Sequence, residues 1–98
     1  MAGYVRELTD DKSLPKAERK QKQVEKAPSL SDGAKQIKLG DKISNIRARI
    51  VPQPNQDERD GLIDYVAWAE KVVAGCRGVN AALDRMFDDT VKLARSTL

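Results

Sequence analysis

The sequence feature that most constrains the fold is an apolar pattern with the period of an α-helix. In the middle of the chain, apolar side chains fall at i, i+4, i+7 and i+11, at Leu39, Ile43, Ile46 and Ile50. Spacings of three and four residues place side chains on one face of a helix. No segment alternates apolar and polar residues over the length of a strand. The sequence therefore predicts an all-α fold.

Capping residues mark where the first two helices begin. Ser13 precedes a proline and predicts a polar, helix-favouring segment over residues 15–25, because proline is tolerated in a first helical turn. An Ala-Pro pair ends that segment. Ser31 or Asp32 is expected to cap the helix that carries the apolar stripe, which runs to about Ile50.

Two further helices follow a proline-rich loop. The third is expected from about Asp57 to Gly75, and Asn80 is expected to cap the fourth. Helical periodicity assigns a core-facing side to each. The residues expected to face inward are Leu62, Tyr65, Val66, Ala69, Val73 and Cys76 in the third helix, and Leu83, Met86, Phe87, Val91 and Ala94 in the fourth.

Composition excludes several kinds of chemistry. The 98 residues fit one small domain or a piece of one, contain no histidine and contain a single cysteine, Cys76. The chain therefore cannot form an internal disulfide, a Cys/His zinc site or a histidine acid–base catalyst. A single unpaired cysteine suits a reducing compartment. Because the sequence also shows no signal peptide and no membrane-spanning apolar run, we expect a cytoplasmic protein without membrane contact.

The basic segment between Lys16 and Lys26 is the main concentration of positive charge. Acidic residues at Glu18 and Glu25 interrupt it, and the net charge of the chain is only +3. We favour a solvated helix here over a phosphate-binding role. Nucleic-acid binding is not expected, because the segment lacks aromatic side chains that would stack on bases.

Polar residues follow one line of the second helix, beside its apolar stripe. Ile37, Asp41 and Asn45 fall at i, i+4 and i+8. A carboxylate and a carboxamide next to a core are costly unless they are paired or bind a ligand. Asp41 either pairs with Lys38 or Lys42 while Asn45 caps a neighbouring element, or Asp41 binds a metal and Asn45 a polar substrate. A single carboxylate is not a metal site, so further ligands would have to come from outside this chain.

Two other positions suggest a site. Gly40 lies inside the predicted helix at a cost of about 1 kcal/mol relative to alanine, which predicts close approach of another backbone or of a ligand. Tyr65 faces inward from the next helix. It is either a core tyrosine whose hydroxyl finds a partner, or the wall of a pocket that it shares with Asn45.

Three sequence blocks carry a family resemblance. The first block is residues 7–20 with 23–25, and it contains Leu-Pro-Lys. The second, within residues 33–47, contains Lys-Leu-Gly-Asp-Lys, and the third lies within residues 65–80. Together they cover nearly the whole chain, and in this order they resemble the small HD-domain alarmone hydrolases, the group of the SpoT-type hydrolase domain and its metazoan homologues.

The resemblance implies an all-helical fold that binds one manganese ion and removes the 3′-pyrophosphate from ppGpp. By this resemblance Asp41 is a metal ligand, Asn45 and Tyr65 line the nucleotide pocket, and Lys16 lies near the phosphates. The family's other metal ligands are a histidine and a His-Asp pair, and an acidic pair after them helps to activate water. All of these precede the matching blocks. We therefore expect residues 1–98 to be the C-terminal part of a single HD-type helical domain, with the N-terminal metal-binding helices absent.

The chain departs from the family pattern at two places. Gly40 replaces a usual alanine. The turn before Tyr65 usually carries a basic residue, where this chain has Gly61-Leu62-Ile63 and Arg59 is the nearest cation.

Two functions stay open at the level of sequence. The first is the C-terminal portion of a manganese-dependent guanosine-3′,5′-bis(diphosphate) 3′-pyrophosphohydrolase, inactive alone and without a catalytic residue of its own; its substrate is ppGpp, NADPH or another phosphorylated nucleotide. The second is a non-catalytic helical module that binds a nucleotide or a partner chain. Without N-terminal helices the apolar stripe is expected to be exposed, and such a surface favours a partner or self-association.

Overall fold

The computed structural model describes residues 15–98, and all regular structure within them is helical, which confirms the all-α prediction. The elements are α2 (Lys16–Lys26), the 3-10 helix η1 (Ala27–Ser29), α3 (Asp32–Arg49), α4 (Gln56–Ala74) and α5 (Ala81–Ser96). The expected cap Ser13 lies outside the described residues. The N-cap position of α2 is Pro15, which offers no side-chain hydrogen bond.

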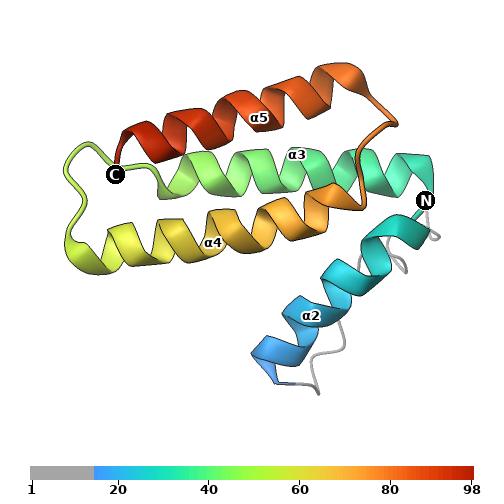
Figure 1. Ribbon diagram of the computed structural model, residues 1–98, viewed down its shortest axis with the longest axis horizontal. Coiled ribbons are helices and arrows are strands. Elements are labelled where there is room, and N and C mark those ends of the chain that lie inside the picture. Colours follow the sequence, from blue (N-terminus) through green and yellow to red (C-terminus); the bar gives the residue numbers. More distant parts are fainter. Residues whose placement is uncertain (1–14) are drawn as a thin grey trace.

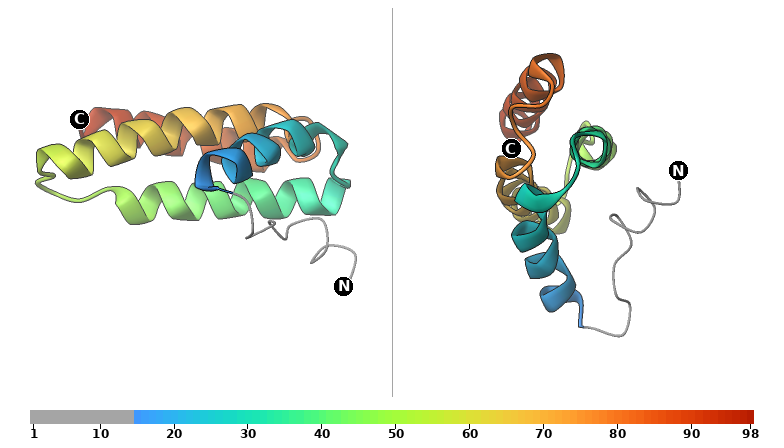
Figure 2. Two further views of the ribbon diagram at one scale, coloured as in Figure 1. Left: turned by 90° about the horizontal axis from the view of Figure 1, so that it is seen from below. Right: turned by 90° about the vertical axis from the view of Figure 1, so that its right-hand side faces the viewer.

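Three helices form the body of the molecule. Figure 1 shows α3, α4 and α5 lying lengthwise beside one another and alternating in direction, with α2 leaving this unit at an angle. The end-on view in Figure 2 shows α2 projecting away from the other three helices. α3 packs against both α4 and α5, whereas α2 packs against α4 and η1. None of the described helices has the length and apolar character needed to cross a membrane.

Side-chain caps begin three of the helices. The Ser31 hydroxyl accepts a hydrogen bond from the backbone N–H three residues later at 3.3 Å, and Asn80 does the same at 3.1 Å, so both predicted caps are confirmed. α4 begins with a reciprocal pair that the sequence analysis missed. Asn55 accepts from the backbone N–H of Glu58 at 2.8 Å, and the Glu58 carboxylate accepts from the backbone N–H of Asn55 at 3.3 Å.

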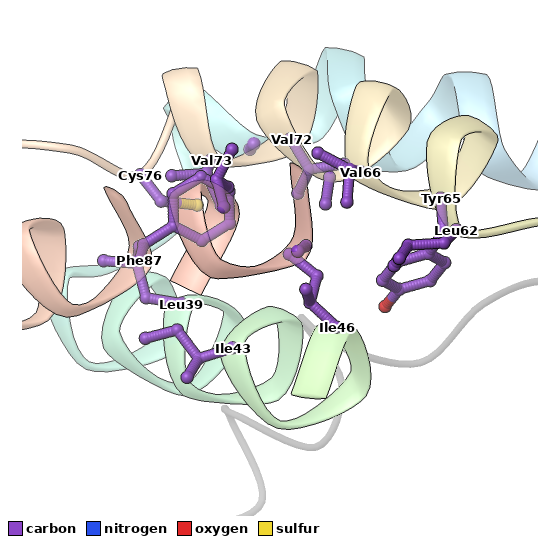
Figure 3. Packing of buried hydrophobic residues seen from close by; sticks show 14 of the residues in the cluster. Leu39, Ile43, Ile46, Leu62, Tyr65, Val66, Val72, Val73, Cys76 and Phe87 are labelled. Atoms are coloured by element: carbon purple, nitrogen blue, oxygen red, sulfur yellow. The ribbon is translucent and has the colours of Figure 1, made fainter. Parts of the chain in front are cut away.

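The hydrophobic core lies between α3, α4 and α5 (Figure 3). Every predicted inward residue of α4 is buried, and Val72 joins them. The core residues of the three helices, together with Cys76, are Ala34, Leu39, Ile43, Ile46, Leu62, Tyr65, Val66, Ala69, Val72, Val73, Cys76, Phe87, Val91 and Ala94. Each of the three helices thus buries one apolar stripe, and this burial drives its packing.

The core-facing side of α5 was assigned wrongly at one position. Met86 is 44% exposed, whereas Thr90 is 2% exposed. The buried stripe of α5 includes Phe87, Thr90 and Val91, and Met86, one turn before Thr90, lies at the exposed edge of that stripe. Thr90 tolerates burial because its hydroxyl donates a hydrogen bond to the Met86 carbonyl at 2.8 Å.

The apolar stripe of α3 is covered, so the expectation that it would be exposed is wrong. Leu39, Ile43 and Ile46 are all buried beneath α4 and α5. Large apolar side chains that are exposed in the described part of the chain occur instead at Ile37, Ile63, Met86, Leu93 and Leu98.

The close backbone approach expected at Gly40 occurs at another glycine. A Cβ atom at Gly40 would meet nothing within 4 Å in the described part of the chain. A Cβ at Gly75, directly after α4, would lie 2.8 Å from Ala27 Cβ, from Pro28 Cδ and from Pro28 N. Gly75 therefore allows η1 to rest against the end of α4, which fixes where α2 leaves the body.

Candidate functional site

Asp41 and Asn45 lie one turn apart on α3, as their spacing predicted. The Asp41 side chain is 52% exposed, and its carboxylate lies 3.5 Å from Lys42 Nζ. Of the two partners considered for Asp41, Lys42 is the one observed, because Lys38 donates to the Gln23 side chain at 3.2 Å instead. Since Asp41 is half-exposed, it does not carry the desolvation cost that the sequence argument assigned to it.

The buried charge at this place is Lys42, which is 3% exposed. Its Nζ atom lies 4.1 Å from the centroid of the Trp68 ring and 5.9 Å from that of Tyr65. The two rings meet edge to face at 5.5 Å. A lysine is rarely buried without compensation, and aromatic faces attract a desolvated ammonium group strongly. The spacing of Tyr65 and Trp68, three residues apart on α4, was the available signal for this aromatic pair.

Tyr65 and Asn45 are brought together across the α3–α4 interface. Burial is the main cause that raises the pKa of Tyr65 above its ordinary value of 10.0, and the negative charge of Asp41 raises it further. A hydrogen bond between the Asn45 side chain and Tyr65 lowers this pKa, and so does the positive charge of Arg49. Figure 3 shows Tyr65 at one end of the packed core. Tyr65 is therefore a core tyrosine, 8% exposed, whose side chain interacts with Asn45. That the two line a nucleotide pocket stays a prediction.

Arg49 extends the polar line of α3 by one more turn, and the sequence analysis missed it. Its guanidinium carbon lies 4.0 Å from the centroid of the Tyr65 ring, and its Nη1 donates to the Asn45 carbonyl at 3.4 Å. Arg49 follows Asn45 by four residues, as Asn45 follows Asp41, so helical spacing could have found it. Beside it lies an open pocket of about 200 Å³ lined by Ala48, Arg49, Val51, Glu58, Gly61 and Leu62.

Lys16 is not brought to this group of residues. It lies exposed in the first turn of α2 and has no hydrogen bond, ion pair or ring contact with Asp41, Asn45 or Tyr65. α2 instead approaches the site through Lys20. The Trp68 indole N–H donates to the Lys20 carbonyl at 3.1 Å, and Lys20 Nζ lies 5.0 Å from the Trp68 ring centroid.

The described residues do not form a metal site by themselves. Residues 15–98 contain no group of three or more His, Cys, Asp or Glu side chains that could hold an ion. Asp41 contributes one half-exposed carboxylate, whereas manganese and similar cations take several ligands. The described residues therefore cannot hold a manganese ion unless further ligands come from elsewhere.

The chain has clear relatives among proteins of known function, although no protein-family model matches it. It is 48% identical over 92 residues to guanosine-3′,5′-bis(diphosphate) 3′-pyrophosphohydrolase MESH1 of Drosophila melanogaster, a match that covers 91% of this chain and 50% of the relative. It is 48% identical over 90 residues to the Homo sapiens protein of the same name, covering 90% of this chain and 49% of the relative.

A solved structure has the same fold. It belongs to a metazoan ortholog of SpoT that hydrolyzes ppGpp, and it superposes with a TM-score of 0.80 at 44% identity, over 98% of this chain and 53% of that one. The helices thus match part of an all-helical HD-domain structure. The chain belongs to the MESH1 family, the metazoan SpoT homologues. It spans about half the length of the curated relatives it matches.

Proposed function

We propose that this chain supplies the nucleotide-binding wall of a guanosine-3′,5′-bis(diphosphate) 3′-pyrophosphohydrolase, with residues 1–98 as the C-terminal part of a single HD-type domain. One observation carries the proposal. Asn45 of α3 lies beside Tyr65 of α4, one turn from the half-exposed Asp41, in a chain that is 48% identical to half of such enzymes.

The proposed roles follow from the chemistry of the side chains. The amide of Asn45 both donates and accepts hydrogen bonds, which suits the polar edges of a nucleotide. The Tyr65 ring adds an apolar surface beside it. Lys16, on the exposed start of α2, is proposed to meet the phosphates from a separate helix. Asp41 is the single carboxylate that this chain would contribute to a manganese ion.

A binding measurement tests the nucleotide wall. Titration calorimetry with ppGpp should show binding to the chain, and Asn45→Ala should weaken it about threefold to tenfold, the effect of losing one or more hydrogen bonds of 0.5–1.5 kcal/mol. Ser44→Ala is the matched control, because Ser44 is exposed on the same helix and lies outside the site. Equal affinities for the two variants would remove the support for the wall.

The isolated chain is expected to have no hydrolase activity, because Asp41 is the one metal-binding carboxylate at the site among the described residues. The assay is manganese-dependent release of pyrophosphate from ppGpp. Turnover that disappears in Asp41→Ala would show that this expectation is wrong.

A second candidate is a non-catalytic module that binds a nucleotide or a partner chain. The observation that favours it is Ile37, an apolar side chain that is 46% exposed one turn before Asp41, at the edge of the proposed site. Sedimentation would test it: association that increases with concentration, and that Ile37→Ser reduces, would favour this function. A stable monomer that binds no nucleotide would count against it.

A further inference from the structure

We infer that Arg49 is a specificity-determining residue that binds an anionic group, a phosphate of the nucleotide, at the rim of the pocket between α3 and α4. This inference rests on the proposed function, because it places one part of the nucleotide relative to Asn45 and Tyr65. The sequence analysis assigned no role to Arg49, either from helical spacing or from the family resemblance.

The position of Arg49 is fixed by two contacts. Its guanidinium packs over the Tyr65 ring, with 4.0 Å from Cζ to the ring centroid, and Nη1 donates to the Asn45 carbonyl at 3.4 Å. Both contacts are to residues of the proposed nucleotide wall. A guanidinium held in this way loses less conformational entropy when it binds an anion than a freely moving side chain does.

Arg49 still has donors to offer. A guanidinium carries five N–H groups, and one of those of Arg49 is used in the hydrogen bonds seen within residues 15–98. The side chain is exposed, so solvent and solutes reach it. Planar guanidinium groups bind phosphate through paired N–H donors, which a lysine cannot reproduce.

The surroundings of Arg49 leave room for an anion. It is the one cationic residue among the six that line the pocket. Gly61 lies on the α4 side, and a Cβ there would meet nothing within 4 Å in the described part of the chain.

Two acidic side chains, one lining the pocket and one on the same line of α3, are already engaged. Glu58 lines the same pocket, but its carboxylate accepts a hydrogen bond from the backbone N–H of Asn55 at 3.3 Å. Asp41, two turns earlier on α3, faces Lys42 at 3.5 Å. Neither carboxylate makes an ion pair with Arg49 in the described residues, so its charge is not neutralised by a protein partner.

The first test compares two ligands that differ in charge. Titrations with ppGpp and with guanosine are run on the chain and on its Arg49→Gln, Arg49→Lys and Arg47→Gln variants. Arg49→Gln is expected to weaken ppGpp binding about tenfold, equivalent to about 1.4 kcal/mol, and to leave guanosine binding unchanged. Arg49→Lys should recover part of the loss. Arg47→Gln, which removes an equal charge from an exposed position of the same helix outside the pocket, should change neither affinity.

The outcomes separate the two proposals. If the chain binds ppGpp but Arg49→Gln matches Arg47→Gln, or weakens both ligands equally, the Arg49 inference is overturned and the nucleotide wall stands. If the chain binds neither ligand, the proposed function fails, and the Arg49 inference fails with it.

A second measurement uses inorganic pyrophosphate as the probe and follows the arginine Nε–Hε signals by NMR. A saturable shift of the Arg49 signal, with the Arg47 signal unmoved, would support the anion subsite. Equal shifts at both arginines would show general attraction of anions to a basic helix and would overturn the inference.

Discussion

Replacing Gly75 with alanine should destabilise the protein, although the backbone at this position suits any residue. Gly75 has φ −82° and ψ −9°, which is helical geometry, so alanine adopts it without strain. The obstacle is space. The new Cβ would lie 2.8 Å from Ala27 Cβ and from both Cδ and N of Pro28, closer than real Cβ contacts occur.

The magnitude follows from what can move. Pro28 N belongs to the backbone and Pro28 Cδ to a closed ring, so neither withdraws by a rotamer change, and η1 itself must shift. Overpacking of this kind costs about 1–3 kcal/mol. Alanine also makes the unfolded chain less flexible than glycine does, which stabilises the folded state by about 0.4–1 kcal/mol. The net destabilisation is therefore about 1–2 kcal/mol, and the Tm should fall by roughly 5–15 °C in a chain of this size.

The assay is thermal and urea unfolding followed by circular dichroism, with Gly40→Ala as the matched control. Gly40 lies inside α3, and a Cβ there would meet no atom of residues 15–98 within 4 Å, so alanine should stabilise the protein by about 0.5–1 kcal/mol. The two substitutions are chemically identical, and only their surroundings differ. A Gly75→Ala protein at least as stable as the original would refute the close packing of η1 against α4.

Three other predictions test the site and its attachments. Burial raises the pKa of Tyr65, so the folded state keeps the hydroxyl proton to a higher pH than the unfolded state does. The contribution of Tyr65 to the free energy of unfolding is therefore full below the ordinary pKa of 10.0 and is lost as the pH rises through the folded pKa. Asn45→Ala should raise the folded pKa further, as measured by NMR of the tyrosine ring carbons. Trp68→Phe removes the N–H donated to the Lys20 carbonyl, at about 0.5–1.5 kcal/mol, and should speed amide hydrogen exchange in α2 more than elsewhere. Asn80→Ala removes the cap of α5 and should lower the free energy of unfolding in urea by about 1 kcal/mol. Asn80→Asp should keep most of this stability, because aspartate is also a good N-cap residue.

For each of these three predictions, one outcome would contradict the reasoning. A Tyr65 pKa that falls in the Asn45→Ala variant would mean that the hydrogen bond does not favour the ionised form. Exchange that quickens equally in all helices of Trp68→Phe would show a global rather than a local effect. Equal losses in the alanine and aspartate variants of Asn80 would point to its amide group, which donates to Gln36 at 3.2 Å, rather than to the cap.

The helical stripes were predictable because they depend on spacing alone. Leu39, Ile43 and Ile46 are buried as their period indicated. The error at Met86 arose where a polar residue, Thr90, occupies the buried stripe and an apolar residue lies beside it. Hydrophobicity ranks residue types, but it does not reveal that a threonine hydroxyl can be satisfied by its own helix.

Features that depend on a second element were not predictable. Lys42 looked like a surface partner for Asp41, and it becomes a buried cation only because α4 presents Trp68 to it. Likewise, the sequence shows that a glycine is unusual but not what faces it, which is why the close approach was expected at Gly40 and found at Gly75.

The candidate site likewise combines features that helical spacing predicts with features that depend on how the helices pack. Helical spacing placed Asp41 and Asn45 on one line, and the fold then brought Tyr65 to Asn45. The roles of Lys16, Asp41, Asn45 and Tyr65 toward metal and nucleotide stay predictions. Lys16 in particular belongs to a helix that buries none of its residues, so its distance from a ligand depends on where α2 lies when that ligand is bound.

The position of Trp68 has a spectroscopic consequence. It is the only tryptophan of the chain, and its indole ring lies between Lys42 of α3 and Lys20 of α2 while donating to the Lys20 carbonyl. The fields of two nearby ammonium groups act on its excited state, and that of Lys20 depends on the placement of α2. Intrinsic fluorescence of this protein therefore reports on one junction rather than on folding as a whole. An emission change without loss of helical circular dichroism would indicate that α2 has moved while the three-helix body stays intact.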